Sequence, residues 1–253
     1  MCGFFKGSVF LNSTEVKLEY ELCDTSKEGI PVIIVAAGAS TRMKGLNKQL
    51  LELNGVPVII QSLLRFENSS VIKNIILVIR TEDLFELQML TEKYMITKLS
   101  DIVCGGATRQ ESVLKGLERL QKSDSKVLIH DGARPFVSDT VITNVTEALD
   151  KYSAVTCAVR VKDTIKRVDE NGLVKNTLDR NTLVAVQTPQ GVWVDKYLEA
   201  IKKAENVAAF TDDSSIMEAA GYEVACVEGS YKNIKITTPE DIAFVRALGE
   251  DEL

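Results

Sequence analysis

Apolar residues from about residue 30 onward alternate between short β-branched runs and longer segments with helical spacing. The runs, which we predict to be strands, are residues 31–35, 74–79, 100–104 and 127–129. Helices are predicted where the apolar residues fall on one helical face, at residues 56–66, 83–94 and 109–121. Ser138 and Thr238 mark two further helix starts. Strands separated by helices of this length indicate crossover connections. The sequence therefore predicts an α/β fold with a Rossmann-like, mainly parallel twisted sheet and flanking helices.

One stretch interrupts this alternation. Residues 159–187 contain two extended segments around the turn Asp169-Glu-Asn-Gly172, and an N-G turn between alternating runs is a hairpin signal. In a parallel α/β domain such a hairpin, at about residues 160–188, projects as an arm. An isolated two-stranded arm is marginally stable in water, so we expect it to pack on a second copy of the chain in a homodimer. The alternative is an arm that folds back on its own domain.

Composition restricts the kinds of partner that the protein can bind and the compartments in which we expect it. The net charge of −6 argues against sequence-independent nucleic-acid binding, which requires a basic surface. The five cysteines are scattered without a C-x-x-C pair, which favours a reducing compartment. No apolar run reaches the length of a membrane span, and residues 1–29 lack the apolar core of a signal peptide. We therefore predict a cytoplasmic protein without nucleic-acid or membrane partners, with residues 1–29 as an N-terminal extension, containing a strand at 15–22, and residues 30–253 as the main domain.

The first candidate motif is A-A-G-A-S-T-R-M at residues 36–43, followed by N-K-Q at 47–49. Small residues after a buried strand let backbone N–H groups approach a phosphate or a base. Arg42 and Lys48 on the same loop could enclose a triphosphate. The loop is neither a Walker A motif nor G-x-G-x-x-G. An ordinary small-residue turn with solvated charges is the alternative reading.

Three further motifs follow predicted strands, and ligands of parallel α/β proteins bind at these strand ends. The second is C-G-G-A-T-R at residues 104–109, with Ser112 available for a base or ribose contact. The third is L-I-H-D-G-A-R-P at 128–135, in which Asp131 is a candidate Mg²⁺ ligand and Arg134 a candidate contact for an anionic second substrate. His130 is not expected to be catalytic, because a phosphate nucleophile needs no base. In the fourth, at 228–237, we predict an alternating strand that carries Lys235 toward the site.

In this order and at these intervals, the motifs resemble those of the 2-C-methyl-D-erythritol 4-phosphate cytidylyltransferases of the non-mevalonate isoprenoid pathway. The resemblance covers roughly residues 31–248. It rests on the motifs above together with V-K-D-T-I-K-R, D-R-N…Q-T-P-Q-G and T-D-D-S-S. The family has a fold of the nucleotide-diphospho-sugar transferase type and transfers CMP from CTP to a methylerythritol phosphate, with Mg²⁺ as cofactor and pyrophosphate as product.

The resemblance implies a role for each matching position. Arg42 and Lys48 correspond to the pair that stabilises charge on the α-phosphate, and Asp131 corresponds to the magnesium carboxylate. Lys235 and Arg180 correspond to residues that position the acceptor phosphate. The cytidine-binding positions are matched by Ala36, Ala37, Gly38, Gly106 and Ser112. Further substrate contacts are matched by Asp131, Arg134, Thr164 and Thr211. In the family, Thr164 and Arg180 lie on an arm that reaches the partner's active site.

The sequence departs from the family pattern at two positions, and three alternative functions remain open. Asn47 precedes Lys48 where members often have proline, and Ala107 replaces an aspartate that some members carry. A ribitol 5-phosphate cytidylyltransferase shares most of the motifs, although the A-R-P and T-D-D-S-S segments favour the methylerythritol enzyme. A nicotinamide-dependent dehydrogenase would need G-x-G-x-x-G, which is missing. A non-catalytic nucleotide-binding protein would not need the cationic residues Arg42, Lys48 and Lys235.

Overall fold

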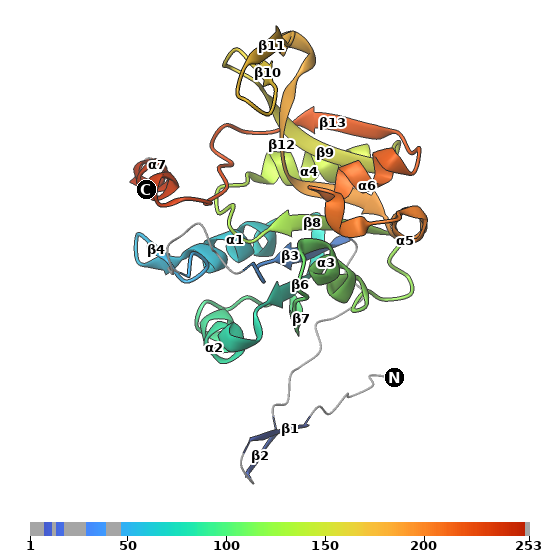
Figure 1. Ribbon diagram of the computed structural model, residues 1–253. Coiled ribbons are helices and arrows are strands. Elements are labelled where there is room, and N and C mark those ends of the chain that lie inside the picture. Colours follow the sequence, from blue (N-terminus) through green and yellow to red (C-terminus); the bar gives the residue numbers. More distant parts are fainter. Residues whose placement is uncertain (1–7, 12–13, 18–28, 39–46, 251–253) are drawn as a thin grey trace.

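The computed structural model describes residues 8–11, 14–17, 29–38 and 47–250 (Figure 1). Within this part of the chain the centre is a seven-stranded sheet in the order β13-β9-β12-β8-β3-β6-β7. Its strands are β3 (Ile30–Val35), β6 (Ile72–Ile79), β7 (Leu99–Cys104), β8 (Lys126–Asp131), β9 (Ala154–Arg160), β12 (Val184–Trp193) and β13 (Val224–Glu228). β12 runs antiparallel to β8 and β9, and the other pairings are parallel. The prediction of a mainly parallel sheet is confirmed.

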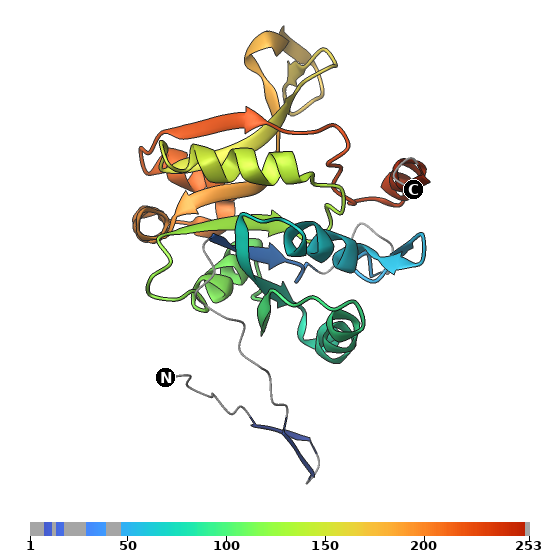
Figure 2. The same cartoon turned by 180° about the vertical axis from the view of Figure 1, so that it is seen from behind.

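Helices cover both faces of the sheet. The helices are α1 (Val58–Glu67), α2 (Leu84–Lys93), α3 (Arg109–Leu117), α4 (Asp139–Ala148), α5 (Val194–Lys203), α6 (Asp213–Ala219) and α7 (Pro239–Glu250). Short 3₁₀ helices are η2 (Thr81–Asp83), η3 (Arg180–Thr182) and η4 (Val207–Ala209). Because side chains alternate along a strand, Val32 and Ile34 of β3 pack with α1, α2 and α4, whereas Ile33 packs with α3, α5 and α6. Figures 1 and 2 show these two helical layers from opposite sides.

Capping residues set several helix boundaries. The Ser138 hydroxyl accepts a hydrogen bond from the Val141 amide, which confirms the predicted start of α4. Asp241 accepts from the amides of Thr237 and Thr238 at the start of α7. The helix predicted from residue 56 begins at Val58 instead, because Val56–Pro57 forms the short strand β5, which pairs with β4 (Glu52–Leu53).

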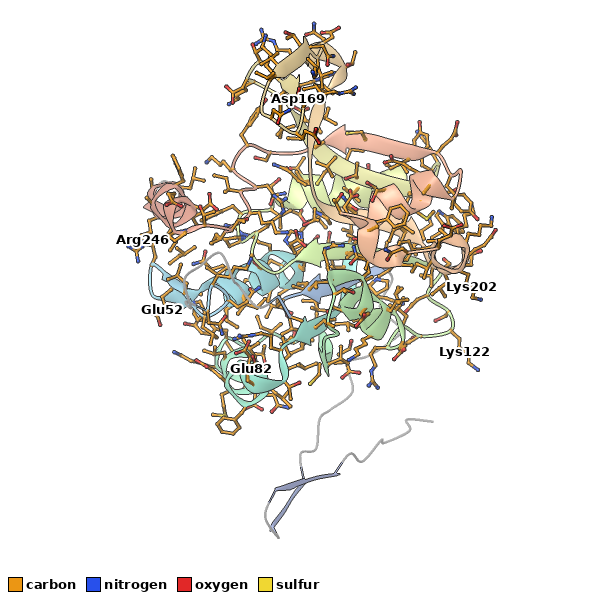
Figure 3. The ribbon with its side chains drawn as sticks, viewed as in Figure 1. Glu52, Glu82, Lys122, Asp169, Lys202 and Arg246 are labelled. Carbon is orange, nitrogen blue, oxygen red and sulfur yellow. The ribbon has the colours of Figure 1, made fainter. Side chains whose placement is uncertain are left out.

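The predicted hairpin is present as β10 (Lys166–Val168) and β11 (Val174–Thr177), which pair antiparallel. It projects from the end of the sheet beyond β9 and β12 (Figure 1), with Asp169 in its turn (Figure 3). The Asp169 carboxylate accepts from the amides of Asn171 and Leu173, and Gly172 supplies the positive φ of 78°. The arm contains fewer residues than the predicted range 160–188. Val184 and Val186 belong to the central sheet instead, where they pair with β9.

Before the main domain, β1 (Ser8–Leu11) pairs antiparallel with β2 (Thr14–Lys17). The strand predicted at 15–22 therefore coincides with β2 only up to Lys17, and residues 18–22 lie outside the described residues. Among the described helices, none has the length and apolar character needed to cross a membrane.

Candidate active site

A cavity of about 520 Å³ opens at the carboxyl ends of β3, β7 and β8. The predicted site residues that line it are Ala37, Gly38, Lys48, Gly106, Ser112, Asp131 and Lys235. They come from widely separated segments, which converge because parallel strands end at the same edge of the sheet. The cavity thus joins parts of all four candidate motifs.

The first motif forms one wall. Ala36 is buried, and its amide donates to the Val78 carbonyl at 2.7 Å, so the backbone enters the loop at a fixed position. At Gly38, no heavy atom of the described residues beyond its chain neighbours lies within 4 Å of where a Cβ would lie. Lys48 Nζ donates to the Ile236 carbonyl at 3.1 Å, which links this wall to the segment that carries Lys235. Arg42 lies in 39–46, outside the described residues.

The second motif forms another wall and is closely packed. Thr108 caps α3 by accepting from the Glu111 amide, and the Glu111 carboxylate accepts from the Ala107 amide. The Ser112 hydroxyl accepts from the Gly106 amide at 3.0 Å and donates to the Thr108 carbonyl. Glycine is required at position 106, because a Cβ there would lie 2.4 Å from that of Glu111. Ser112 therefore shapes the loop from within the cavity wall.

The Asp131 carboxylate is surrounded by cationic side chains. Lys235 Nζ lies 2.8 Å from Oδ2, Arg109 Nε lies 3.3 Å from Oδ1, and Arg134 Nε lies 3.7 Å from Oδ2. Burial alone would raise the pKa of Asp131, but the charges of Arg109, Lys235 and Arg134 outweigh it and hold that pKa well below its usual range. Asp131 is therefore ionised at neutral pH, within a site of net positive charge.

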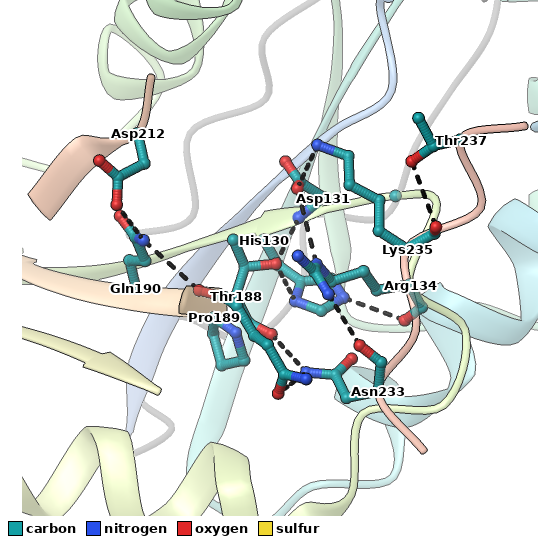
Figure 4. A network of polar contacts seen from close by, with 12 residues as sticks. His130, Asp131, Arg134, Thr188, Pro189, Gln190, Asp212, Asn233, Lys235 and Thr237 are labelled. Carbon is teal, nitrogen blue, oxygen red and sulfur yellow. Dashed lines mark hydrogen bonds and ion pairs between the residues drawn. The ribbon is translucent and has the colours of Figure 1, made fainter. Parts of the chain in front are cut away.

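Behind Asp131, a chain of hydrogen bonds fixes the neighbouring His130 (Figure 4). The Thr188 hydroxyl accepts from the Asp131 amide at 3.0 Å, so its proton is directed at His130 Nδ1, 3.1 Å away. His130 Nε2 then carries the ring proton and donates to the Arg134 carbonyl at 3.2 Å. Burial lowers the His130 pKa to about 3, although the nearby Asp131 charge opposes this shift. His130 is neutral and fully buried, as expected for a residue without a catalytic role.

Lys235 reaches Asp131 from a loop, so the predicted strand at 228–237 is wrong beyond Glu228. Ladder pairing ends there because the chain turns, with the Asn233 amide donating to the Ser230 carbonyl. Asn233 is fully buried, and its side-chain amide donates to the Thr188 carbonyl at 2.8 Å. The Gln187 side chain makes two hydrogen bonds to the backbone of Ser230: it accepts from the Ser230 amide and donates to the Ser230 carbonyl. Side-chain hydrogen bonds therefore replace the ladder that was expected to hold Lys235.

The remaining predicted residues do not line the cavity. Arg134 lies beneath Asp131 and donates to the Asn233 carbonyl at 2.7 Å. Arg180 and Thr164 are exposed on the arm, where Arg180 donates to the Lys162 carbonyl at 3.0 Å. Thr211 is exposed in the loop before α6. The contacts predicted for these four residues stay predictions.

Sequence reasoning missed Arg109, which lines the cavity and also pairs with Asp213. The Arg109 Nη2 to Asp213 Oδ2 distance is 2.7 Å, and Asp213 is completely buried. The two carboxylates raise the pKa of Arg109 above its usual value despite the opposing effect of burial. Both residues stand in motifs that had been singled out, G-G-A-T-R and T-D-D-S-S, but nothing local indicated that they meet.

A metal site made by protein side chains alone is not present in the described residues, which contain no group of three or more His, Cys, Asp or Glu suited to a metal. Asp131 is the only carboxylate among the described residues that line the cavity. Because Mg²⁺ in phosphate-transfer sites is held by one or two carboxylates together with phosphate oxygens and water, Asp131 fits as its protein ligand.

A mostly parallel sheet with small-residue loops and lysines gathered at its carboxyl edge defines a nucleotidyltransferase of the α/β class. The family model for 2-C-methyl-D-erythritol 4-phosphate cytidylyltransferase matches residues 30–250, and the chain belongs to this family. That match starts where the predicted N-terminal extension ends.

Individual relatives agree with the family match. A 2-C-methyl-D-erythritol 4-phosphate cytidylyltransferase of Clostridium novyi is 44% identical over 87% of this chain and 96% of its own length. The enzyme of the same name from Halalkalibacterium halodurans is 47% identical over 86% of this chain and 95% of its own. A solved 4-diphosphocytidyl-2C-methyl-D-erythritol synthase of Anaerococcus prevotii superposes with a TM-score of 0.79 at 35% identity, covering 88% of this chain and 97% of that one.

Proposed function

We propose that this chain transfers CMP from CTP to 2-C-methyl-D-erythritol 4-phosphate, giving 4-diphosphocytidyl-2-C-methyl-D-erythritol and pyrophosphate. The observation that carries the proposal is the meeting of Lys48, Lys235 and Asp131 around one cavity lined by the small-residue loops at Gly38 and Gly106. Family membership and relatives that cover nearly the same length of chain support it.

The reaction is an in-line displacement at phosphorus. A phosphate oxygen of the acceptor bonds to the α-phosphorus of CTP, and the bond from that phosphorus to the bridging oxygen of pyrophosphate breaks. The acceptor phosphate is already anionic, so little proton transfer is needed and catalysis depends on positioning and charge stabilisation. Lys48 and Arg42 are assigned to the α-phosphate, and Lys235 to the acceptor phosphate. Gly38 and Gly106 line the cavity and are assigned to the nucleotide, which their backbone can approach without an intervening side chain of their own.

Asp131 is assigned to Mg²⁺, with the remaining ligands supplied by substrate phosphates and water. When bound, the ion neutralises charge on the triphosphate and on the departing pyrophosphate. Lys235 is only partly buried and contacts Oδ2 of Asp131 through a flexible stem, so it can turn to an incoming phosphate.

The arm is proposed to complete the site of a second copy in a homodimer. Its hairpin exposes Val168, Leu173 and Val174 by 52%, 63% and 59%, which is unusual for a two-stranded element that must be stable. Arg180 and Thr164, on the segments that flank this hairpin, lie outside the cavity of their own chain. A partner's cavity is the proposed destination of both side chains.

The test is pyrophosphate release by the purified protein with Mg²⁺, comparing 2-C-methyl-D-erythritol 4-phosphate with ribitol 5-phosphate and CTP with ATP, GTP and UTP. The proposal requires the methylerythritol phosphate with CTP to give the highest kcat/KM. Preference for ribitol 5-phosphate would reassign the acceptor, and nucleotide binding without turnover would identify a non-catalytic binding protein.

A further inference from the structure

Arg109 is divided between two carboxylates that belong to different parts of the fold. Its Nε faces Asp131 Oδ1 at 3.3 Å, and its Nη2 faces Asp213 Oδ2 at 2.7 Å. Both contacts are hydrogen bonds, but only the one to Asp213 has the short distance typical of a charge-assisted hydrogen bond. Arg109 is therefore held mainly by Asp213 and only loosely by Asp131.

In the side-on bidentate geometry, arginine donates two parallel hydrogen bonds, from Nε and Nη2, to the two oxygens of one carboxylate. The same chain shows this undivided geometry at Arg80, whose Nε and Nη2 bind the two oxygens of Asp83 at 2.8 and 2.7 Å. At Arg109 the equivalent pair is split, because Asp213 takes the nitrogen that a full fork on Asp131 would need. Arg109 Nη1 is buried and has no hydrogen-bond partner among the described residues, so it does not compensate for the split.

Asp213 is fixed in place. It is completely buried at the first position of α6, and its Oδ1 accepts from the Tyr197 hydroxyl at 2.7 Å. Tyr197 is itself completely buried on α5. Asp213 therefore cannot follow Arg109 toward Asp131 without breaking a buried hydrogen bond.

We propose that Asp213, held by Tyr197, is a positioning residue that keeps Arg109 from closing on Asp131 and so leaves the Asp131 carboxylate available to the divalent cation. This inference rests on the proposed function, in which Asp131 is the protein ligand of Mg²⁺. Without the pull of Asp213, Arg109 would form on Asp131 the fork that Arg80 forms on Asp83, and it would compete with the ion for the same oxygens.

The substitution Asp213→Asn tests the idea, because it removes the charge that restrains Arg109 and keeps the side-chain size. The probe is Mn²⁺ with CTP in the absence of acceptor, with free Mn²⁺ followed by electron paramagnetic resonance, so that binding is measured without turnover. We expect the Mn²⁺ dissociation constant to rise about tenfold or more, the usual effect of losing a residue that supports a metal ligand. The matched control is Asp101→Asn, which removes the acid of the half-exposed pair with Arg119 and should leave binding unchanged.

The double variant Arg109→Gln with Asp213→Asn separates positioning from general damage. It removes the competing guanidinium together with its anchor, so binding should return to within about threefold of the wild type. If D213N binds Mn²⁺ and CTP like the wild type, or if the double variant binds more weakly than D213N, the inference is overturned.

A milder variant covers the case in which D213N does not fold. Tyr197→Phe keeps the buried ring and removes only the hydroxyl that holds Asp213, so it should weaken Mn²⁺ binding in the same direction by about two- to threefold. An unchanged dissociation constant in Y197F would overturn the inference. Absence of pyrophosphate release by the wild type would count against the proposed function instead, because the Mn²⁺ titration does not depend on an acceptor.

Discussion

His130 illustrates how one buried side chain can report on the whole site. Both ring nitrogens are occupied in the neutral form, with Nδ1 accepting from Thr188 and Nε2 donating to the Arg134 carbonyl. The chain contains one histidine, so no other histidine contributes to titration between pH 5 and 7. The stability of the protein in this interval should therefore depend on His130 more than on any other side chain.

Lowering the pH from 7 to 5 should reduce the free energy of unfolding by about 2 kcal/mol. The His130 pKa is lowered from 6.5 to about 3 in the folded state, so only the unfolded state takes up a proton in this range. Stability is thus present above the unfolded value and is lost as the pH falls. Urea unfolding at both pH values measures the change. His130→Gln removes the titrating group, and equal wild-type stability at both pH values would contradict the burial argument.

Lys48→Ala and Lys235→Ala should each lower kcat by about 10²–10³, or roughly 3–4 kcal/mol, because each removes a cation from oxygens that gain charge. Arg42→Ala carries the same expectation from the sequence resemblance alone. Folding should stay intact, since Lys48 and Lys235 are only partly buried. Steady-state kinetics measure the loss, with the exposed Lys202→Ala as the matched control. Near-normal turnover in either variant would remove that lysine from the mechanism.

At this scale the sequence predicts which residues line the cavity better than it predicts how they are held. Lys48, Asp131 and Lys235 follow from motifs at strand ends. The pairing of Arg109 with Asp213 does not, because the two residues are 104 positions apart and meet only when α3 and α6 are placed on the same face of the sheet. Arg134 shows a different difficulty. Its motif suggested a substrate contact, which stays a prediction, and nothing in that motif indicated that its guanidinium would lie beneath Asp131 and donate to the Asn233 carbonyl.

The loop between β7 and α3 is tightly packed against its neighbours and also lines the cavity. A Cβ at Gly105 would lie 2.3 Å from that of Ala37 and 2.8 Å from the Ser112 hydroxyl, so this glycine lets two walls of the cavity touch. Gly105→Ala should therefore lower the free energy of unfolding by about 1–3 kcal/mol, the typical cost of overpacking, and should weaken CTP binding by spreading the walls.

Calorimetric titration with CTP measures this effect, and the melting temperature serves as the control for folding. A variant that still unfolds in one cooperative transition but binds CTP more weakly supports a role for the glycine in spacing the walls. Unchanged CTP affinity would mean that the loop adapts without affecting the cavity.

Element types were predictable where periodicity is strong and where a cap is local, as for β3, β6 and the start of α4. The position of β12 between β8 and β9 was not, because an antiparallel strand inserted in a parallel sheet is selected by its neighbours rather than by its own residues. The strand predicted for Lys235 failed for a similar reason. Residues 233–237 do alternate between polar and apolar side chains. However, the buried side chains of Gln187 and Asn233 make the hydrogen bonds to the backbone that a neighbouring strand would have made.

At the scale of the whole molecule, the arm separates two of the predicted functional residues from the cavity of their own chain. Arg180 lies on the arm and Lys48 lies in the cavity, so a homodimer with exchanged arms would draw each residue of a site from a different copy. If the sites are shared in this way, two inactive variants should restore activity to each other, which sites formed by one chain alone would not allow.

Arg180→Ala and Lys48→Ala proteins, each nearly inactive alone, should regain activity when unfolded, mixed in equal amounts and refolded together. Random pairing makes half of the dimers mixed, and one of the two sites in each mixed dimer carries both intact residues, so about one quarter of wild-type activity is expected. Refolding the R180A and K48A proteins separately tests whether refolding itself restores activity, and neither should regain any. If Arg180 instead acted in the cavity of its own chain, every site in the R180A and K48A mixture would lack one of the two residues and no activity would return.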